Sequence, residues 1–180
     1  MRRFQIGVMG SAADLKYDET TQQIAEKIGE LIGERDGILV FGAEKDVDSL
    51  STAACRGAKK AGGLTLGVTY GKNKDIWQKD ADIIIPSGLE RGGGREMVLV
   101  LACDAVIAVG GGSGTLTELA IAYQADIPMI GIEGVGGWSD TLANTYIDDR
   151  KRRKVIGASS AVAAVEIAFR EAAQYRSNYA

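Results

Sequence analysis

The chain has 180 residues, with 46% hydrophobic and 25% charged residues, which is the size and composition of one globular domain. Its net charge of −3 argues against a nucleic-acid surface, which needs a basic face, and no segment reaches the roughly 18 to 20 apolar residues of a membrane span. It contains no histidine, which excludes histidine-based catalytic triads and removes the commonest transition-metal ligand. We expect a single domain over residues 1–180, cytoplasmic, with no metal, cofactor, nucleic-acid partner or membrane partner.

Strand-like runs alternate with helix-like runs along the chain. The hydrophobic patterns predict strands at residues 4–9, 38–41, 64–69, 82–85, 104–109, 128–132 and 154–158. They predict helices at residues 19–34, 48–61, 95–102, 115–125, 138–147 and 160–175. This alternation predicts an α/β fold of Rossmann-like, doubly wound type: a mostly parallel sheet of about seven strands with helices on both faces.

In such folds, the loops that leave the carboxyl ends of the strands line the ligand crevice. The first of these loops begins at Gly10-Ser11. Two others, Gly92–Gly94 and Gly110–Gly114, are rich in glycine, and each runs straight into a predicted helix. We therefore expect a binding site formed by these loops.

The loop from Gly110 to Thr115 has the features of a phosphate site. Glycines let the backbone approach a ligand closely, and the start of the next helix adds free N–H donors and the positive end of its dipole. The hydroxyls of Ser113 and Thr115 add further donors. The alternative is a tight strand-to-helix turn that binds nothing.

Glu118 and Arg95 are the candidate catalytic side chains. Thr115 and Glu118 have the spacing of a helix capping box, but Glu118 could equally be a carboxylate that points into the crevice. Arg95 lies at a helix start, where the dipole disfavours a cation, so an anion or Glu118 should lie opposite it unless its side chain is simply solvated. Acidic residues in the second crevice loop would repel phosphate unless they face away. We expect Asp46 or Asp48 to cap the following helix, because a carboxylate near a helix start is favoured by the dipole.

The segment from Gly111 to Glu118 resembles the PGGxGTxxE signature of the family called LOG or lysine decarboxylase-like. The resemblance extends over most of the chain, including Gly10-Ser11 and the strand at 104–109. Gly94-Arg95-Glu96 is similar to the subgroup that contains the molybdenum-cofactor carrier proteins.

Characterised LOG enzymes are phosphoribohydrolases of nucleoside 5′-monophosphates. The resemblance implies that Glu118 is the catalytic carboxylate and Arg95 its partner. It also implies a phosphate site that includes the first loop and the signature: Gly10, Ser11, Gly111, Gly112, Ser113, Gly114 and Thr115. Three positions depart from the family pattern: Gly110 replaces a proline, Glu96 replaces a basic residue, and the segment 42–48 is acidic instead of glycine-rich.

Two functions stay open. One is binding of a nucleotide or other phosphate-bearing small molecule at Gly110–Thr115, with phosphoribohydrolase activity. The other is a non-catalytic carrier or sensor, for a molybdopterin-type cofactor or a nucleotide signal. A homodimer or higher homo-oligomer is also expected, from the resemblance and from apolar residues assigned to helix surfaces: Val98, Leu99, Leu101, Ile121 and Tyr123.

Overall fold

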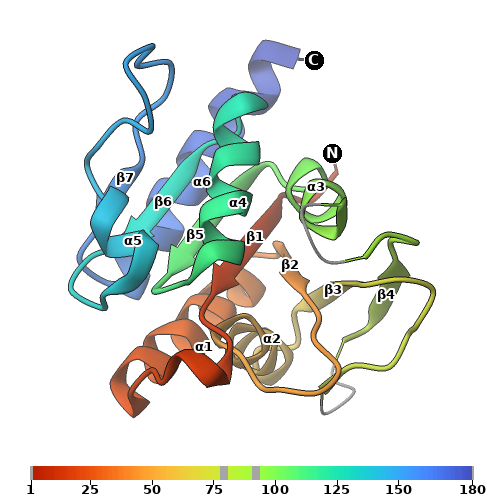
Figure 1. Cartoon of the computed structure of the whole chain (residues 1–180). Coiled ribbons are helices and arrows are strands. Elements are labelled where there is room, and N and C mark those ends of the chain that lie inside the picture. Colours follow the sequence, from red (N-terminus) through yellow and green to blue (C-terminus); the bar gives the residue numbers. More distant parts are fainter. Residues whose placement is uncertain (1, 78–80, 91–93, 180) are drawn as a thin grey trace.

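The computed structural model describes residues 2–77, 81–90 and 94–179. Seven strands form one sheet in the order β4-β3-β2-β1-β5-β6-β7, and every neighbouring pair is parallel. The predicted fold class is therefore confirmed, and Figure 1 shows the strands in this order from β4 on the right to β7 on the left. The strands are β1 (Gln5–Gly10), β2 (Ile38–Gly42), β3 (Leu64–Thr69), β4 (Ile83–Pro86), β5 (Ala105–Val109), β6 (Met129–Ile132) and β7 (Ile156–Ala158).

The helices cover both faces of this sheet (Figure 1). One face packs against α1 (Glu19–Glu34), α2 (Leu50–Lys60) and α6 (Ala161–Tyr179). The other packs against α3 (Gly94–Leu101), α4 (Ser113–Gln124) and α5 (Gly137–Leu142). A short 3-10 helix, η1 (Ala13–Leu15), follows β1. Among the described residues, no helix combines the length and apolar character that crossing a membrane requires.

The central strands carry the core. All five residues of β5 are buried, and they face the two helical layers alternately, with Ile107 toward one cluster and Val106 toward the other. A strand with helices on both faces needs apolar residues at every position, which explains the continuous Ala-Val-Ile-Ala-Val run. The strand order reverses between β1 and β5, where ligands bind in open sheets of this kind.

Five of the six predicted helices have boundaries that differ from the structure, and two of the differences affect the site or the chain before β7. α4 begins at Ser113, two residues earlier than predicted. α5 ends at Leu142 instead of at residue 147, because Ala143 is extended and Asn144 takes a φ of 61°. The backbone N–H of Asn144 then donates to the carbonyl of Val155, so this segment pairs with the chain before β7 and cannot continue as a helix.

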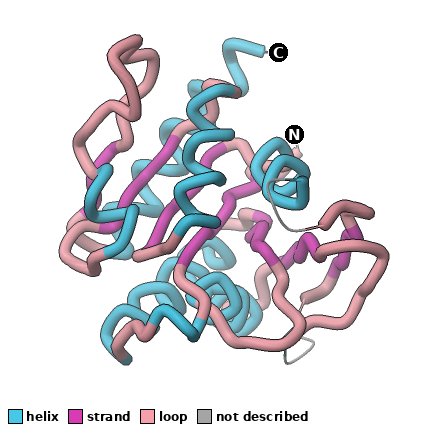
Figure 2. The backbone as a smooth tube through the Cα atoms, in the orientation of Figure 1, coloured by secondary structure: helices cyan, strands magenta, loops and turns pink. Residues whose placement is uncertain are grey.

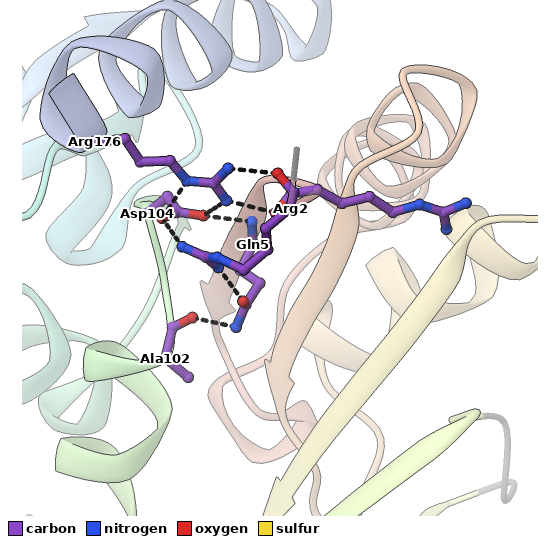
Figure 3. A network of polar contacts seen from close by, with 6 residues as sticks. Arg2, Gln5, Ala102, Asp104 and Arg176 are labelled. Carbon is purple, nitrogen blue, oxygen red and sulfur yellow. Dashed lines mark hydrogen bonds and ion pairs between the residues drawn. The ribbon is translucent and has the colours of Figure 1, made fainter. Parts of the chain in front are cut away.

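A buried carboxylate joins the two ends of the chain to the middle of the sheet (Figure 3). Asp104, just before β5, accepts hydrogen bonds from Arg176 on α6, Arg2 at the amino terminus, and the backbone N–H of Gln5. Burial alone would raise the pKa of Asp104, but these hydrogen bonds and the charge of Arg176 outweigh it and hold the pKa below its ordinary value. The network ties α6 and the first residues of the chain to the centre of the sheet.

Candidate functional site

A pocket of about 240 Å³ lies at the carboxyl edge of the sheet, beside the point where the strand order reverses. Its walls come from the loops after β1, β2 and β5 and from the first turns of α3 and α4. Figure 2 shows these loops in pink where they leave the strands. The lining includes predicted site residues from three segments: Gly10, Arg95, Gly112, Ser113, Gly114, Thr115 and Glu118. Gly92 and Gly93 of the other glycine-rich loop lie outside the described residues.

The start of α4 forms one wall of the pocket. Gly112 is the N-terminal cap residue, and Ser113, Gly114 and Thr115 make the first turn. The N–H groups of a first helical turn have no acceptor within the helix, and no described residue accepts a hydrogen bond from these three. This geometry, on a helix of 12 residues, suits a phosphate group.

Gly110 and Gly111 shape the loop but do not offer their own N–H groups to a ligand. The N–H of Gly111 donates to the hydroxyl of Ser11 at 2.8 Å, and that of Gly110 donates to the hydroxyl of Ser139 at 2.8 Å. Gly111 has a φ of 100°, and a Cβ atom there would lie 2.4 Å from Thr115. This bond between Ser11 and Gly111 holds the loop in place, and the N–H groups left without a described acceptor are those of the first turn of α4.

Glu118 does not cap the helix. The capping-box interpretation needs Thr115 at the N-terminal cap, but Thr115 lies inside α4 and the cap is Gly112, whose position makes no side-chain capping bond. Glu118 instead lines the pocket, 6% exposed, with no hydrogen bond to its carboxylate from a described residue. The alternative interpretation, a carboxylate facing the crevice, is the one that fits the structure.

Arg95 is buried and not solvated. It is 5% exposed, and its Nη2 donates to the Tyr70 hydroxyl at 2.6 Å and lies 3.2 Å and 3.3 Å from Oε1 of Glu44 and Glu96. Its guanidinium also lies over the Tyr70 ring, 4.2 Å from the ring centroid. The anion expected opposite Arg95 is therefore supplied first by the protein itself, through Glu44 and Glu96.

Three carboxylates lie near one cation, Arg95, and the pKa values of two of them, Glu118 and Glu96, shift in opposite directions. Burial raises the pKa of Glu118 to about 8; the charges of Glu96 and Glu44 add to this effect, while Arg95 opposes it. Burial also acts to raise the pKa of Glu96, but its hydrogen bond from Tyr70 and the nearby Arg95 hold that pKa below the ordinary value. Titratable groups whose pKa values shift in opposite directions within one pocket are typical of functional sites.

The acidic side chains after β2 point in different directions. Asp48 turns away to pair with Arg56 at 3.0 Å, while Glu44 faces the pocket beside Arg95. The capping role assigned to Asp46 or Asp48 was wrong: Ser49 is the cap of α2 and accepts from the N–H of Thr52 at 3.0 Å.

The sequence did not predict two groups of residues that shape the site. Tyr70, at the end of β3, has no sequence signal, because its role depends on the side chain of Arg95 stacking on it. Ser139 and the backbone N–H of Trp138 support the glycine loop from α5, the N–H of Trp138 donating to the carbonyl of Gly111 at 3.1 Å. Contacts between elements so far apart in sequence leave no local pattern.

Two of the residues assigned to an apolar helix surface belong to the core. Leu99 and Tyr123 are 0% and 2% exposed and pack against the sheet. Leu101 is exposed, together with Met97, and both line a shallow apolar groove between α3 and α4. The groove also contains Leu116, Thr117, Ala120, Ile121, Gln124 and Ala125.

The parallel α/β sheet with a glycine-rich turn over a pocket at its switch point places the protein among the LOG-like, Rossmann-type proteins. The profile of the SLOG cluster4 family matches residues 3–165, and the chain belongs to that family. An uncharacterised protein of Archaeoglobus fulgidus is 39% identical over 124 residues, which is 69% of this chain and 76% of that protein.

Two solved structures are similar over nearly their whole length. The molybdenum cofactor binding protein of the phototrophic bacterium Rippkaea orientalis is 34% identical, with a TM-score of 0.78, covering 93% of this chain and 96% of that one. The molybdenum cofactor carrier protein of Chlamydomonas reinhardtii is 28% identical, with a TM-score of 0.79, covering 96% and 99%. The resemblance to LOG-like proteins near the molybdenum-cofactor carriers is thereby confirmed.

Proposed function

We propose that the protein binds a phosphorylated small molecule in the pocket at the carboxyl edge of the sheet and holds it as a carrier, with a molybdenum-cofactor-type compound as the leading candidate. The observation that carries this proposal is the first turn of α4, where the N–H groups of Ser113, Gly114 and Thr115 face the pocket side without acceptors among the described residues. The carrier role is favoured by the similarity to the proteins of Rippkaea orientalis and Chlamydomonas reinhardtii.

Gly114 allows a test with a matched control. A Cβ at this position meets nothing within 4 Å, so Gly114→Ala should keep both the loop and the N–H group. Gly114→Pro removes that N–H without breaking a helical hydrogen bond, because the N–H groups of the first turn have no acceptor within the helix. The proline variant should bind phosphorylated ligands more weakly by about 1.5 to 3 kcal/mol, the contribution of one hydrogen bond to a charged group.

The measurement is calorimetric titration with inorganic phosphate, ribose 5-phosphate, AMP and the molybdenum cofactor. The alanine variant should bind each ligand as the wild type does, while the proline variant should bind all of them more weakly. If both variants match the wild type, the ligand does not use the first turn of α4. If none of these compounds binds to the wild type, the proposed function is wrong.

A second candidate function is phosphoribohydrolase activity, favoured by Glu118. A buried carboxylate beside the phosphate cradle could stabilise positive charge at a ribosyl centre as the bond to the base loosens. Against it, Glu44 and Glu96 already compensate the charge of Arg95. Release of free base from nucleoside monophosphates, lowered by about 10² or more in Glu118→Gln, would make the protein an enzyme. We expect no such release.

A further inference from the structure

The lining of the pocket combines two kinds of chemistry. The backbone cradle at Gly112–Thr115 suits an anion. The lining also includes an acidic wall, which we define as Glu44, Glu96 and Glu118, and Arg95 is the only cation among the described residues that line the pocket. A ligand that uses both features carries a phosphate group and, on another part of the molecule, hydrogen-bond donors.

Glu118 is the member of the acidic wall that is left for a ligand. Oε1 of Glu96 accepts a hydrogen bond from the Tyr70 hydroxyl at 2.7 Å and lies close to Arg95, and Glu44 also pairs with Arg95. The carboxylate of Glu118 accepts no hydrogen bond from any described residue, although it is 6% exposed. Its oxygens are therefore available to accept hydrogen bonds from a ligand that supplies N–H groups.

The contacts of Arg95 place its guanidinium within this wall. Its Nη1 lies so close to Gly42 that a Cβ atom there would be 2.0 Å away, and its Nη2 is engaged by the Tyr70 hydroxyl and the carboxylates. Its Nε and Nη1 are buried without acceptors. The guanidinium is therefore fixed in the wall, and its charge is balanced by Glu44 and Glu96.

We propose that the acidic wall recognises the donor edge of a phosphorylated heterocycle, with Glu118 accepting hydrogen bonds from two adjacent N–H groups such as those of a 2-amino-4-oxopyrimidine ring. A carboxylate has two oxygens in one plane and pairs bidentately with two parallel N–H donors. Guanine nucleotides and pterin phosphates share this edge, and adenine lacks it. The inference rests on the proposed function, because the phosphate cradle sets the position of the ring.

The test compares GMP with IMP, which differ only in the 2-amino group. Titration is performed at pH 8.5, above the pKa of about 8 of Glu118, so that the carboxylate is ionised before the ligand arrives. The wild type should bind GMP about tenfold or more tightly than IMP, since one charge-assisted hydrogen bond is lost with the amino group. In Glu118→Gln the ratio should fall close to one, while Glu34→Gln, which alters an exposed glutamate at the end of α1, should keep the wild-type ratio.

The outcomes separate this inference from the function on which it rests. Equal binding of GMP, IMP and ribose 5-phosphate would overturn recognition of the ring edge but leave the phosphate site in place. Tighter binding of AMP than of GMP would also overturn it. If no compound binds, including inorganic phosphate, both proposals are wrong. A pterin phosphate titrated in parallel identifies which of the two ring systems the acidic wall prefers. If Glu118→Gln misfolds, the ratio of GMP affinity to IMP affinity in the wild type alone tests the proposal.

Discussion

Replacing Glu118 by glutamine should stabilise the folded protein at neutral pH. In the unfolded chain the carboxyl group titrates near its ordinary pKa of about 4.3, whereas in the folded protein burial raises that pKa to about 8. Between these two values the unfolded state is ionised and the folded state must keep a proton. The stabilising contribution of the raised pKa is fully present below about pH 4 and is lost as the pH rises through 8.

The size of this effect follows from linkage: when the folded state binds one more proton than the unfolded state, the unfolding free energy falls by about 1.4 kcal/mol per pH unit. The wild type should lose up to about 4 kcal/mol of unfolding free energy between pH 5 and pH 8 through Glu118 alone, as an upper limit. Glutamine keeps the shape of the side chain and does not titrate. The difference in stability between Glu118→Gln and the wild type should therefore grow with pH, in favour of the variant.

Urea unfolding of both proteins at pH 5, 6.5 and 8 measures this difference, because other titrating groups are common to both. Glu34→Gln is the matched control, and its difference from the wild type should stay within about 0.5 kcal/mol at each pH, as for most exposed positions. A difference for Glu118→Gln that stays constant, or that shrinks as the pH rises, would refute the assignment of Glu118 as a buried, proton-retaining group.

Three further predictions concern the framework of the site. Asp104→Ala should lower the unfolding free energy by about 2 kcal/mol or more at pH 7, because Arg176 loses its buried partner. Since the pKa of Asp104 is lowered in the folded protein, the difference should disappear as the pH falls below about 4, and acid unfolding curves would contradict it if the difference persisted. Gly111→Ala should cost about 1 to 3 kcal/mol from its φ of 100° and its contact with Thr115, measured by thermal unfolding; an unchanged midpoint would contradict this. Leu101→Asp should shift a homodimer toward monomer in light scattering, and a wild type that is already monomeric at micromolar concentration would show that the groove is not a self-association surface.

The sequence predicts the sheet well because its strands are short apolar runs separated by glycine and polar residues. The boundaries of β3 and α1 agree with the prediction to the residue. The prediction fails where a distant contact decides the local structure. α5 is shorter than its apolar pattern suggests, because Asn144 pairs with Val155.

In the candidate site, too, local features could be predicted and features that depend on distant contacts could not. The glycine-rich turn at Gly112–Thr115 is a local signal and appears in the pocket as predicted. Which carboxylate faces the ligand is not a local property, since Glu118 and Thr115 have the spacing of a capping box and only the start of α4 at Ser113 excludes it. Likewise, the pairing of Arg95 with Tyr70 depends on the packing of α3 against the end of β3, which no sequence spacing records.

The reversal of strand order has a consequence for how the chain holds together. The strands β1 to β4 come from the amino-terminal half, the strands β5 to β7 from the carboxyl-terminal half, and the two sets meet only where β1 pairs with β5. The pocket lies across that seam, since one set of its walls follows β1 and β2 and the other follows β5. A ligand bound there would act as a clamp, and its binding energy would oppose any opening that pulls the two halves apart.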